Sequence, residues 1–220
     1  MINFELDKRE QIKQMIDYVF NKYRKIDILI NNNIFEYDEQ KLINTFIFIY
    51  FLINNIIFLF FYKSPDDIYD KLIKQNMTSY FYSMKYVIPY MEKQNWGRII
   101  NISSVEVGQL QKSAFTATQH AILGMTKVAA LETARSKVSI NCICPGIVYS
   151  DLQVKKIKLL MQDKNITYNE AKLQIINNKQ PTQDFIYPEQ ISDVALFLCQ
   201  NSSQEIRGEA ISVDGGWTAQ

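Results

Sequence analysis

Two adjacent serines, Ser103 and Ser104, directly follow the isoleucine-rich segment 98–102, which has the pattern of a β-strand. Ligands of open parallel sheets bind beyond the carboxyl ends of the strands. A serine pair at that point is therefore a candidate for chemistry. A hydroxyl in the same place can equally cap a following helix, and position alone does not separate the two roles.

The cysteines and the single histidine do not indicate a disulfide framework or a metal site. Cys142, Cys144 and Cys199 form no recognisable disulfide framework, and together with His120 they do not have the spacing of a zinc site. No metal is expected. This cysteine usage predicts a reducing location, in the cytoplasm or the mitochondrial matrix.

All seven glycines lie at or after Gly97. A loop that cradles phosphates needs glycine where the chain turns sharply and approaches the ligand closely. The first 96 residues are therefore not expected to contain such a loop.

The composition is that of one globular domain. The 220 residues are 47% apolar and 21% charged, with a formal net charge of +1. Lys and Arg are spread along the chain, whereas nucleic-acid binding requires clustered cations. No nucleic-acid partner is expected.

Helices and strands alternate along the chain, as judged from apolar periodicity. Helices are predicted at 11–25, 65–97, 113–135, 155–178 and 188–198, and strands at 26–30, 98–102, 138–144 and 211–213. Such alternation predicts an α/β fold with a doubly wound parallel sheet, in a single domain that spans 1–220.

Residues 42–62 carry no charge and are flanked by Lys41 and Lys63. The run is long enough to cross a bilayer, but Asn44, Asn54 and Asn55 would be costly in lipid. A buried insertion is a second interpretation, and translated non-coding sequence from an AT-rich genome is a third. We favour the third, while membrane association through this run stays open.

Several motifs resemble the short-chain dehydrogenase/reductase family, and most of all its bacterial-type D-3-hydroxybutyrate dehydrogenases. The motifs are Ile28-Leu-Ile-Asn-Asn32, Gly97-Arg-Ile-Ile-Asn-Ile-Ser-Ser104, Gln119-His-Ala-Ile-Leu-Gly124, Asn141-Cys-Ile-Cys-Pro-Gly146 and Ser212-Val-Asp-Gly-Gly-Trp217. The resemblance covers roughly 4–34 and 64–220. It implies a Rossmann-like fold, NAD as cofactor, a small 3-hydroxy acid as substrate and a homo-oligomeric assembly.

The resemblance also implies roles for individual residues. Ser104 matches the serine that holds the substrate oxygen, and Asn76 matches an asparagine that supports a proton relay. Lys112 and Trp217 match substrate-pocket positions. The residues that match the cofactor side are Asn31, Pro145, Gly146 and Ser150.

Two positions depart from the family in a way that removes its chemistry. The family uses a tyrosine as acid and base, and a lysine one helical turn later lowers the pKa of that tyrosine from about 10. Phe115 and Gln119 occupy these positions. The glycine-rich loop and the first strands would precede residue 4, so the fold is expected to be truncated in its nucleotide-binding half.

Three hypotheses follow. The chain is a catalytically degenerate homologue, or an active enzyme whose true sequence is longer, or a non-catalytic module that pairs with an intact relative through the helix at 113–135. Of the family sheet order 3-2-1-4-5-6-7, only strands 4 to 7 would remain. The strand at 26–30 would then be an exposed apolar edge, which predicts a marginally stable and poorly soluble monomer.

Overall fold

The computed structural model describes residues 5–32, 66–105, 113–177 and 179–220. Its centre is a four-stranded parallel sheet in the order β1-β2-β3-β4. The strands are β1 (Ile28–Asn31), β2 (Gly97–Ile102), β3 (Val138–Pro145) and β4 (Ala210–Val213). This arrangement confirms the predicted α/β class and the predicted order of neighbouring strands.

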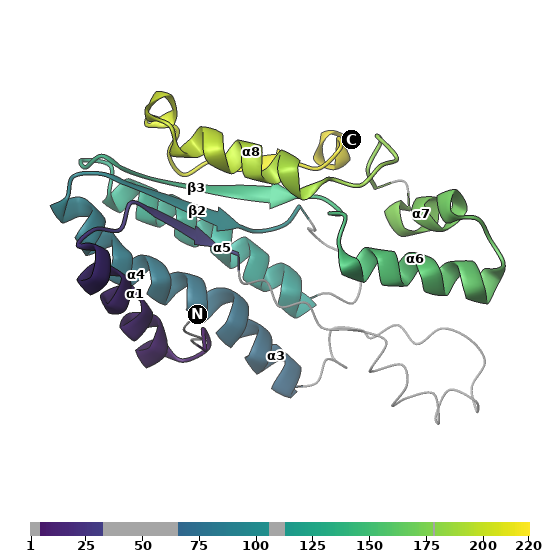
Figure 1. The fold of residues 1–220 in the computed structure, drawn as a ribbon, viewed down its shortest axis with the longest axis horizontal. Helices are drawn as coiled ribbons and strands as arrows, with labels where there is room; N and C mark the ends of the chain where they lie inside the picture. The colour runs from purple at the N-terminus through teal and green to yellow at the C-terminus, as the bar shows by residue number, and fades with distance from the viewer. Residues whose placement is uncertain (1–4, 33–65, 106–112, 178) are drawn as a thin grey trace.

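Helices cover both faces of the sheet (Figure 1). On one face lie α1 (Arg9–Tyr23), α4 (Ser79–Lys93) and α5 (Ser113–Glu132), and on the other lies α8 (Pro188–Cys199). The pair α6 (Asp151–Lys164) and α7 (Tyr168–Ile176) stands beyond the carboxyl ends of the strands. From that position, α6 and α7 can cover a ligand that binds at the carboxyl ends of the strands.

The core forms because β2 and β3 are buried along their whole length. Their apolar side chains pack against α1, α4 and α5 on one face, in a cluster that includes Ile16, Val87 and Ile99. On the other face Ile100 and Ile143 pack against Leu198 of α8. Strands that are buried on both faces read as continuous apolar runs, which is why the sequence predicts them well.

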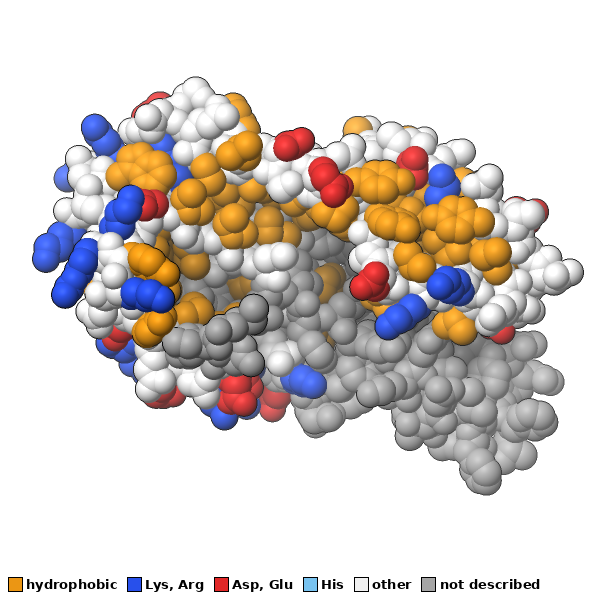
Figure 2. Space-filling model, in the orientation of Figure 1, with side chains coloured by type: hydrophobic (Ala, Val, Ile, Leu, Met, Phe, Trp, Pro, Cys, Tyr) orange, Lys and Arg blue, Asp and Glu red, His pale blue; other side chains and the backbone are white. Residues whose placement is uncertain are grey.

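Strand β1 is an edge of the sheet within the described part of the chain, as predicted. Ile28 and Ile30 are 45% and 51% exposed, although both are large apolar residues. In Figure 2 hydrophobic side chains gather on the face over the strands and α8, and again over α6 and α7.

Two predicted helices are interrupted. The segment predicted at 155–178 is two helices, because Asn165 takes a left-handed conformation (φ 52°) that ends α6. Thr167 and Glu170 then form a reciprocal capping box that begins α7. The segment predicted at 65–97 starts as α3 (Asp66–Leu72) and passes through a π-helical turn, Ile73–Thr78, before α4.

Among the helices of the described ranges, none combines the length and the apolar composition needed to cross a bilayer. Residues 42–62, for which a membrane span was one interpretation, lie outside those ranges.

Candidate active site

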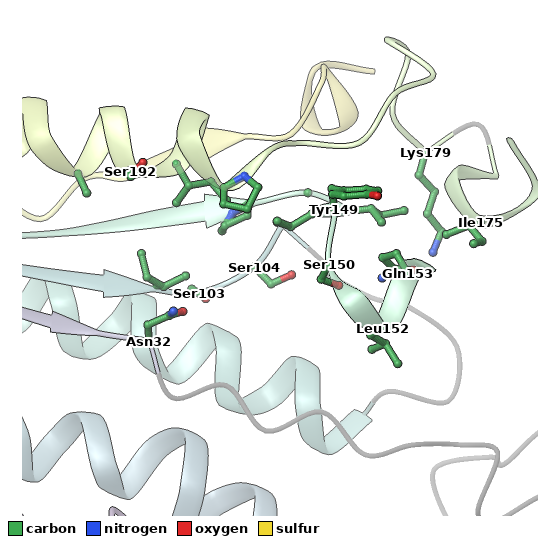
Figure 3. Close-up of a pocket in the computed structure, with 18 of the residues that line it drawn as sticks. Asn32, Ser103, Ser104, Tyr149, Ser150, Leu152, Gln153, Ile175, Lys179 and Ser192 are labelled. Carbon is green, nitrogen blue, oxygen red and sulfur yellow. The ribbon is translucent and has the colours of Figure 1, made fainter. Parts of the chain in front are cut away.

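A cavity of about 700 Å³ lies at the carboxyl ends of β1, β2 and β3, next to α6 and the start of α8 (Figure 3). This is where ligands bind in open α/β sheets. Its polar lining includes Asn32, Ser103, Ser104, Ser150, Gln153 and Ser192. The cavity is therefore the candidate site in this fold.

The two serines after β2 have different surroundings. Ser103 is buried, and its hydroxyl lies 3.2 Å from the carbonyl oxygen of Gln119 and 3.1 Å from Oε1 of the same residue. Ser104 is half-buried and lines the cavity. The structure thus places Ser104, the predicted oxygen-holding residue, at the cavity, while Ser103 ties β2 to α5.

Phe115 and Gln119, which the resemblance matches to the family acid and its cation, lie in the first turns of α5. Phe115 is buried and is one of the residues that line the cavity. One helical turn later, Gln119 is 1% exposed, and its amide Nε2 has no hydrogen-bond partner among the described residues. Phe115 has no proton to transfer, and Gln119 is neutral. Neither of these two side chains can donate a proton to a substrate as an acid or supply a positive charge.

Asn76 stands in the π-helical turn before α4 and is fully buried. Its Nδ2 donates to Thr118 Oγ1 at 3.4 Å, and Thr118 in turn donates to the carbonyl of Phe115 at 2.7 Å. Single π-helical turns are frequent at functional sites. Asn76 is thus connected to the backbone of α5 beside Phe115, but it does not line the cavity.

Asn31, predicted on the cofactor side, belongs to a buried polar chain instead of the cavity wall. Its Nδ2 donates to Asn101 Oδ1 at 2.8 Å, and Asn101 donates to Thr126 Oγ1 at 2.8 Å. Successive residues of a strand point to opposite faces. The next residue, Asn32, accordingly lines the cavity.

Pro145, Gly146 and Ser150 all line the cavity where β3 ends and α6 begins. The amide of Gly146 donates to Val213 at 2.9 Å. A methyl group at Gly146 would collide with Oε1 of Gln180 and lie 3.0 Å from Cα of Asp214. Glycine is therefore required there for packing against Gln180 and β4.

Of the two predicted substrate-pocket residues, Lys112 lies outside the described residues. Trp217 packs against a cluster that includes Tyr80 and Cys144, and it does not line this cavity. The ammonium of Lys179 lies 5.0 Å from the centre of the Trp217 ring, within cation–π range. Trp217 thus supports a cavity-lining lysine.

Sequence reasoning missed three residues of the site. Tyr149 and Lys179 line the cavity, and the buried Gln180 supports its floor through Ile147. Lys156, which stands where the resemblance implies a pocket glutamine, also lines the cavity. Tyr149 directly precedes Ser150, a neighbour that could have drawn attention to it. Lys179 and Gln180 carry no signal of their own, because polar residues in a loop have the same sequence pattern whether or not they line a cavity.

The family model described as enoyl-(acyl carrier protein) reductase matches residues 1–218. The chain is 34% identical over 218 residues to D-beta-hydroxybutyrate dehydrogenase of Cupriavidus necator and 35% identical over 218 residues to that of Rhizobium meliloti. Each match covers 98% of this chain and 77% of the relative.

Solved structures agree with the fold. ElxO with NADP bound is similar with a TM-score of 0.78 at 23% identity, over 100% of this chain and 78% of that one. A variant of actinorhodin polyketide ketoreductase with NADPH also gives a TM-score of 0.78, at 20% identity over 99% of this chain and 77% of that one. With the sheet, the motifs and the family model in agreement, the chain belongs to the short-chain dehydrogenase/reductase family, as an oxidoreductase homologue that resembles 3-hydroxybutyrate dehydrogenase.

Proposed function

We propose that this chain is a catalytically degenerate homologue of 3-hydroxybutyrate dehydrogenase, which keeps a cavity for a small acid but does not transfer hydride at an enzymatic rate. One observation carries the proposal. Phe115 occupies the cavity wall where the family places its acid, and Gln119, one turn later, is buried and uncharged. Ser104 remains at the cavity to contact a substrate oxygen.

The loss of the general acid and its neighbouring cation should lower the rate strongly. General acid–base catalysis contributes about 10²- to 10⁴-fold, which corresponds to roughly 3 to 5 kcal/mol of activation free energy. Ser104 cannot replace the phenol, because an unassisted hydroxyl neither gives nor takes a proton readily near neutral pH. Both the acid and its tuning cation would have to be supplied elsewhere.

Within the described part of the chain, Tyr149 is the phenol that lines the same cavity, but its surroundings do not suit the role of the acid. Its ring packs near Phe185 and Tyr187, with centroid distances of 5.8 and 5.6 Å. The residue four positions later is Gln153, so no cation follows Tyr149 by one helical turn. We expect Tyr149 to form a wall of the cavity.

NAD, the cofactor implied by the family, fits the described residues at one end only. Gly146 and Ser150, which the resemblance matches to the cofactor side, line the cavity. At the other end, residues 5–32 provide no glycine, so no close backbone approach to a pyrophosphate is available there. Our proposal therefore includes weak NAD binding, and no reaction step is assigned to it.

Acetoacetate reduction with NADH tests the proposal. The full chain should show no turnover above background, while F115Y/Q119K restores the family pair and should raise any measurable rate by at least about 10²-fold. The matched control F115L/Q119L keeps both sites neutral and should leave the rate unchanged. Turnover by the unmodified chain at an ordinary enzymatic rate would refute catalytic degeneracy.

A second candidate function is pairing with an intact relative. A groove of about 640 Å³ runs along α4 and α5, and it is lined by Phe81 and Val128, which are 47% and 55% exposed, and by the charged residues Lys85 and Glu132. Mixing the chain with an intact 3-hydroxybutyrate dehydrogenase and measuring mass by sedimentation tests this function. A mixed species that V128D abolishes would support it, and separate sedimentation of the two proteins would contradict it.

A further inference from the structure

The apolar part of the cavity lining has no role in the chemistry considered so far. Ile30 of β1, Ile102 of β2, and Ile191 and Ala195 of α8 all line the cavity. Ile102, Ile191 and Ala195 also belong to one cluster of the hydrophobic core. The end of the cavity between the strands and α8 therefore has a mainly apolar wall.

Polar donors gather at the other end of the cavity, where α6 begins. Ser150 stands directly before α6, and Gln153 and Lys156 lie on one face of this helix, because they are three residues apart. In Figure 3, Ser192 of α8 lies at the left, whereas Ser150 and Gln153 lie at the right. The cavity thus has an apolar end and a polar end, which come from different helices.

The cavity is larger than a four-carbon acid requires. Such a hydroxy acid has about seven non-hydrogen atoms, and at roughly 30 Å³ each they fill at most about 200 Å³. The cavity measures about 700 Å³, a size typical of sites that enclose much larger ligands. A four-carbon acid that reaches the polar end would therefore leave most of the apolar wall without a contact.

A longer alkyl chain would cover this wall and leave the carboxylate among the donors. Burial of each methylene group against apolar side chains strengthens binding by up to about fourfold. The reverse orientation would place the carboxylate against the apolar wall, which is costly for an unpaired charge. The distribution of polar and apolar lining thus favours one orientation of an amphipathic acid.

We propose that the cavity binds medium-chain monocarboxylic acids, with the alkyl chain along Ile30, Ile102 and Ile191 and the carboxylate toward the start of α6. This inference rests on the proposed function, in which the cavity keeps an acid-binding role without turnover. It adds a chain length beyond that of a 3-hydroxybutyrate.

Calorimetric titration of the full chain with butyrate, hexanoate and octanoate tests the inference, because these acids differ only in the number of methylene groups. Affinity should rise about two- to fourfold for each added methylene, so octanoate should bind at least about 16-fold more tightly than butyrate. A chain-length series that shows no rise, or no binding of octanoate, would overturn the inference.

Two residues of the edge strand give a matched pair of variants. Ile30 lines the cavity and Ile28 does not, although both point to the same face of β1 and are similarly exposed, at 51% and 45%. I30N should weaken octanoate binding by at least about threefold and leave butyrate binding within about twofold, whereas I28N should change neither.

The same loss of octanoate affinity in I28N as in I30N would show binding to the exposed edge of the sheet and would overturn the inference. The proposed function has a separate readout, since rapid acetoacetate turnover would overturn it without changing the chain-length series.

Discussion

Gln180 connects the loop before α8 to the floor of the cavity, and its replacement by leucine should destabilise the protein strongly. The side chain is fully buried. Its Oε1 accepts from the amide of Ile147, and its Nε2 donates to the carbonyl oxygen of Asp184 at 2.6 Å. Leucine has a similar size but can form neither bond, so two backbone groups lose their partners.

Each buried polar group left unpaired costs roughly 1 to 3 kcal/mol. Because both bonds of Gln180 are partly rather than fully buried, we expect Q180L to lower the free energy of unfolding by about 2 to 4 kcal/mol. In a chain of this length each kcal/mol shifts Tm by about 2 to 4 °C, so Tm should fall by about 10 °C.

Urea unfolding and calorimetry of Q180L against the unmodified chain measure this effect. Gln14, which is exposed on α1, provides the control Q14L, with an expected change below about 0.5 kcal/mol. If Q180L unfolded within that range, or if Q14L cost as much as Q180L, the two hydrogen bonds would not support the cavity floor as described.

Three further variants probe the sheet and its edges. Burial alone would raise the pKa of Asp214, but hydrogen bonds from Thr218 and the backbone outweigh it and hold this pKa below its usual value. The stability that this group contributes is thus present above about pH 4 and is lost as pH falls through the folded pKa. D214N should therefore make the free energy of unfolding less dependent on pH in this acidic range, as measured by urea titrations at several pH values. T126V removes the oxygen that accepts a hydrogen bond from the buried Asn101 amide at 2.8 Å, and it should lower the free energy of unfolding in urea by about 1 to 3 kcal/mol. A decrease below about 0.5 kcal/mol would contradict the role given to this hydrogen bond. I28K places a charge on the exposed edge strand and should raise the fraction of monomer measured by sedimentation. Unchanged aggregation would show that this edge strand does not cause it.

Local pattern predicted the elements well where burial dominates. Buried runs such as Arg98–Ile102 and Val138–Cys144 became β2 and β3 almost to the residue, because a strand covered on both faces is mostly apolar. Helix ends were less predictable. Asn165 ends α6 through a left-handed backbone conformation that an apolar periodicity does not register.

The candidate site was only partly predictable. Ser104, Pro145, Gly146 and Ser150 line the cavity, whereas Asn31 faces Asn101 in the buried polar chain. The difference between Asn31 and Asn32 is one step along a strand, and which face each residue takes depends on how β1 pairs with β2.

Residue type by itself determined that positions 115 and 119 carry neither a phenol nor an ammonium group, because no folding can give Phe115 a hydroxyl or Gln119 a positive charge. The tertiary structure alone decided which residues surround the cavity. Lys156 and Lys179 are 23 positions apart in the sequence, and they share one space only because α6 and α7 pack against each other beyond the sheet. Long-range packing of this kind is set by the burial of apolar faces. The sequence around the polar residues therefore does not show which of them will become neighbours.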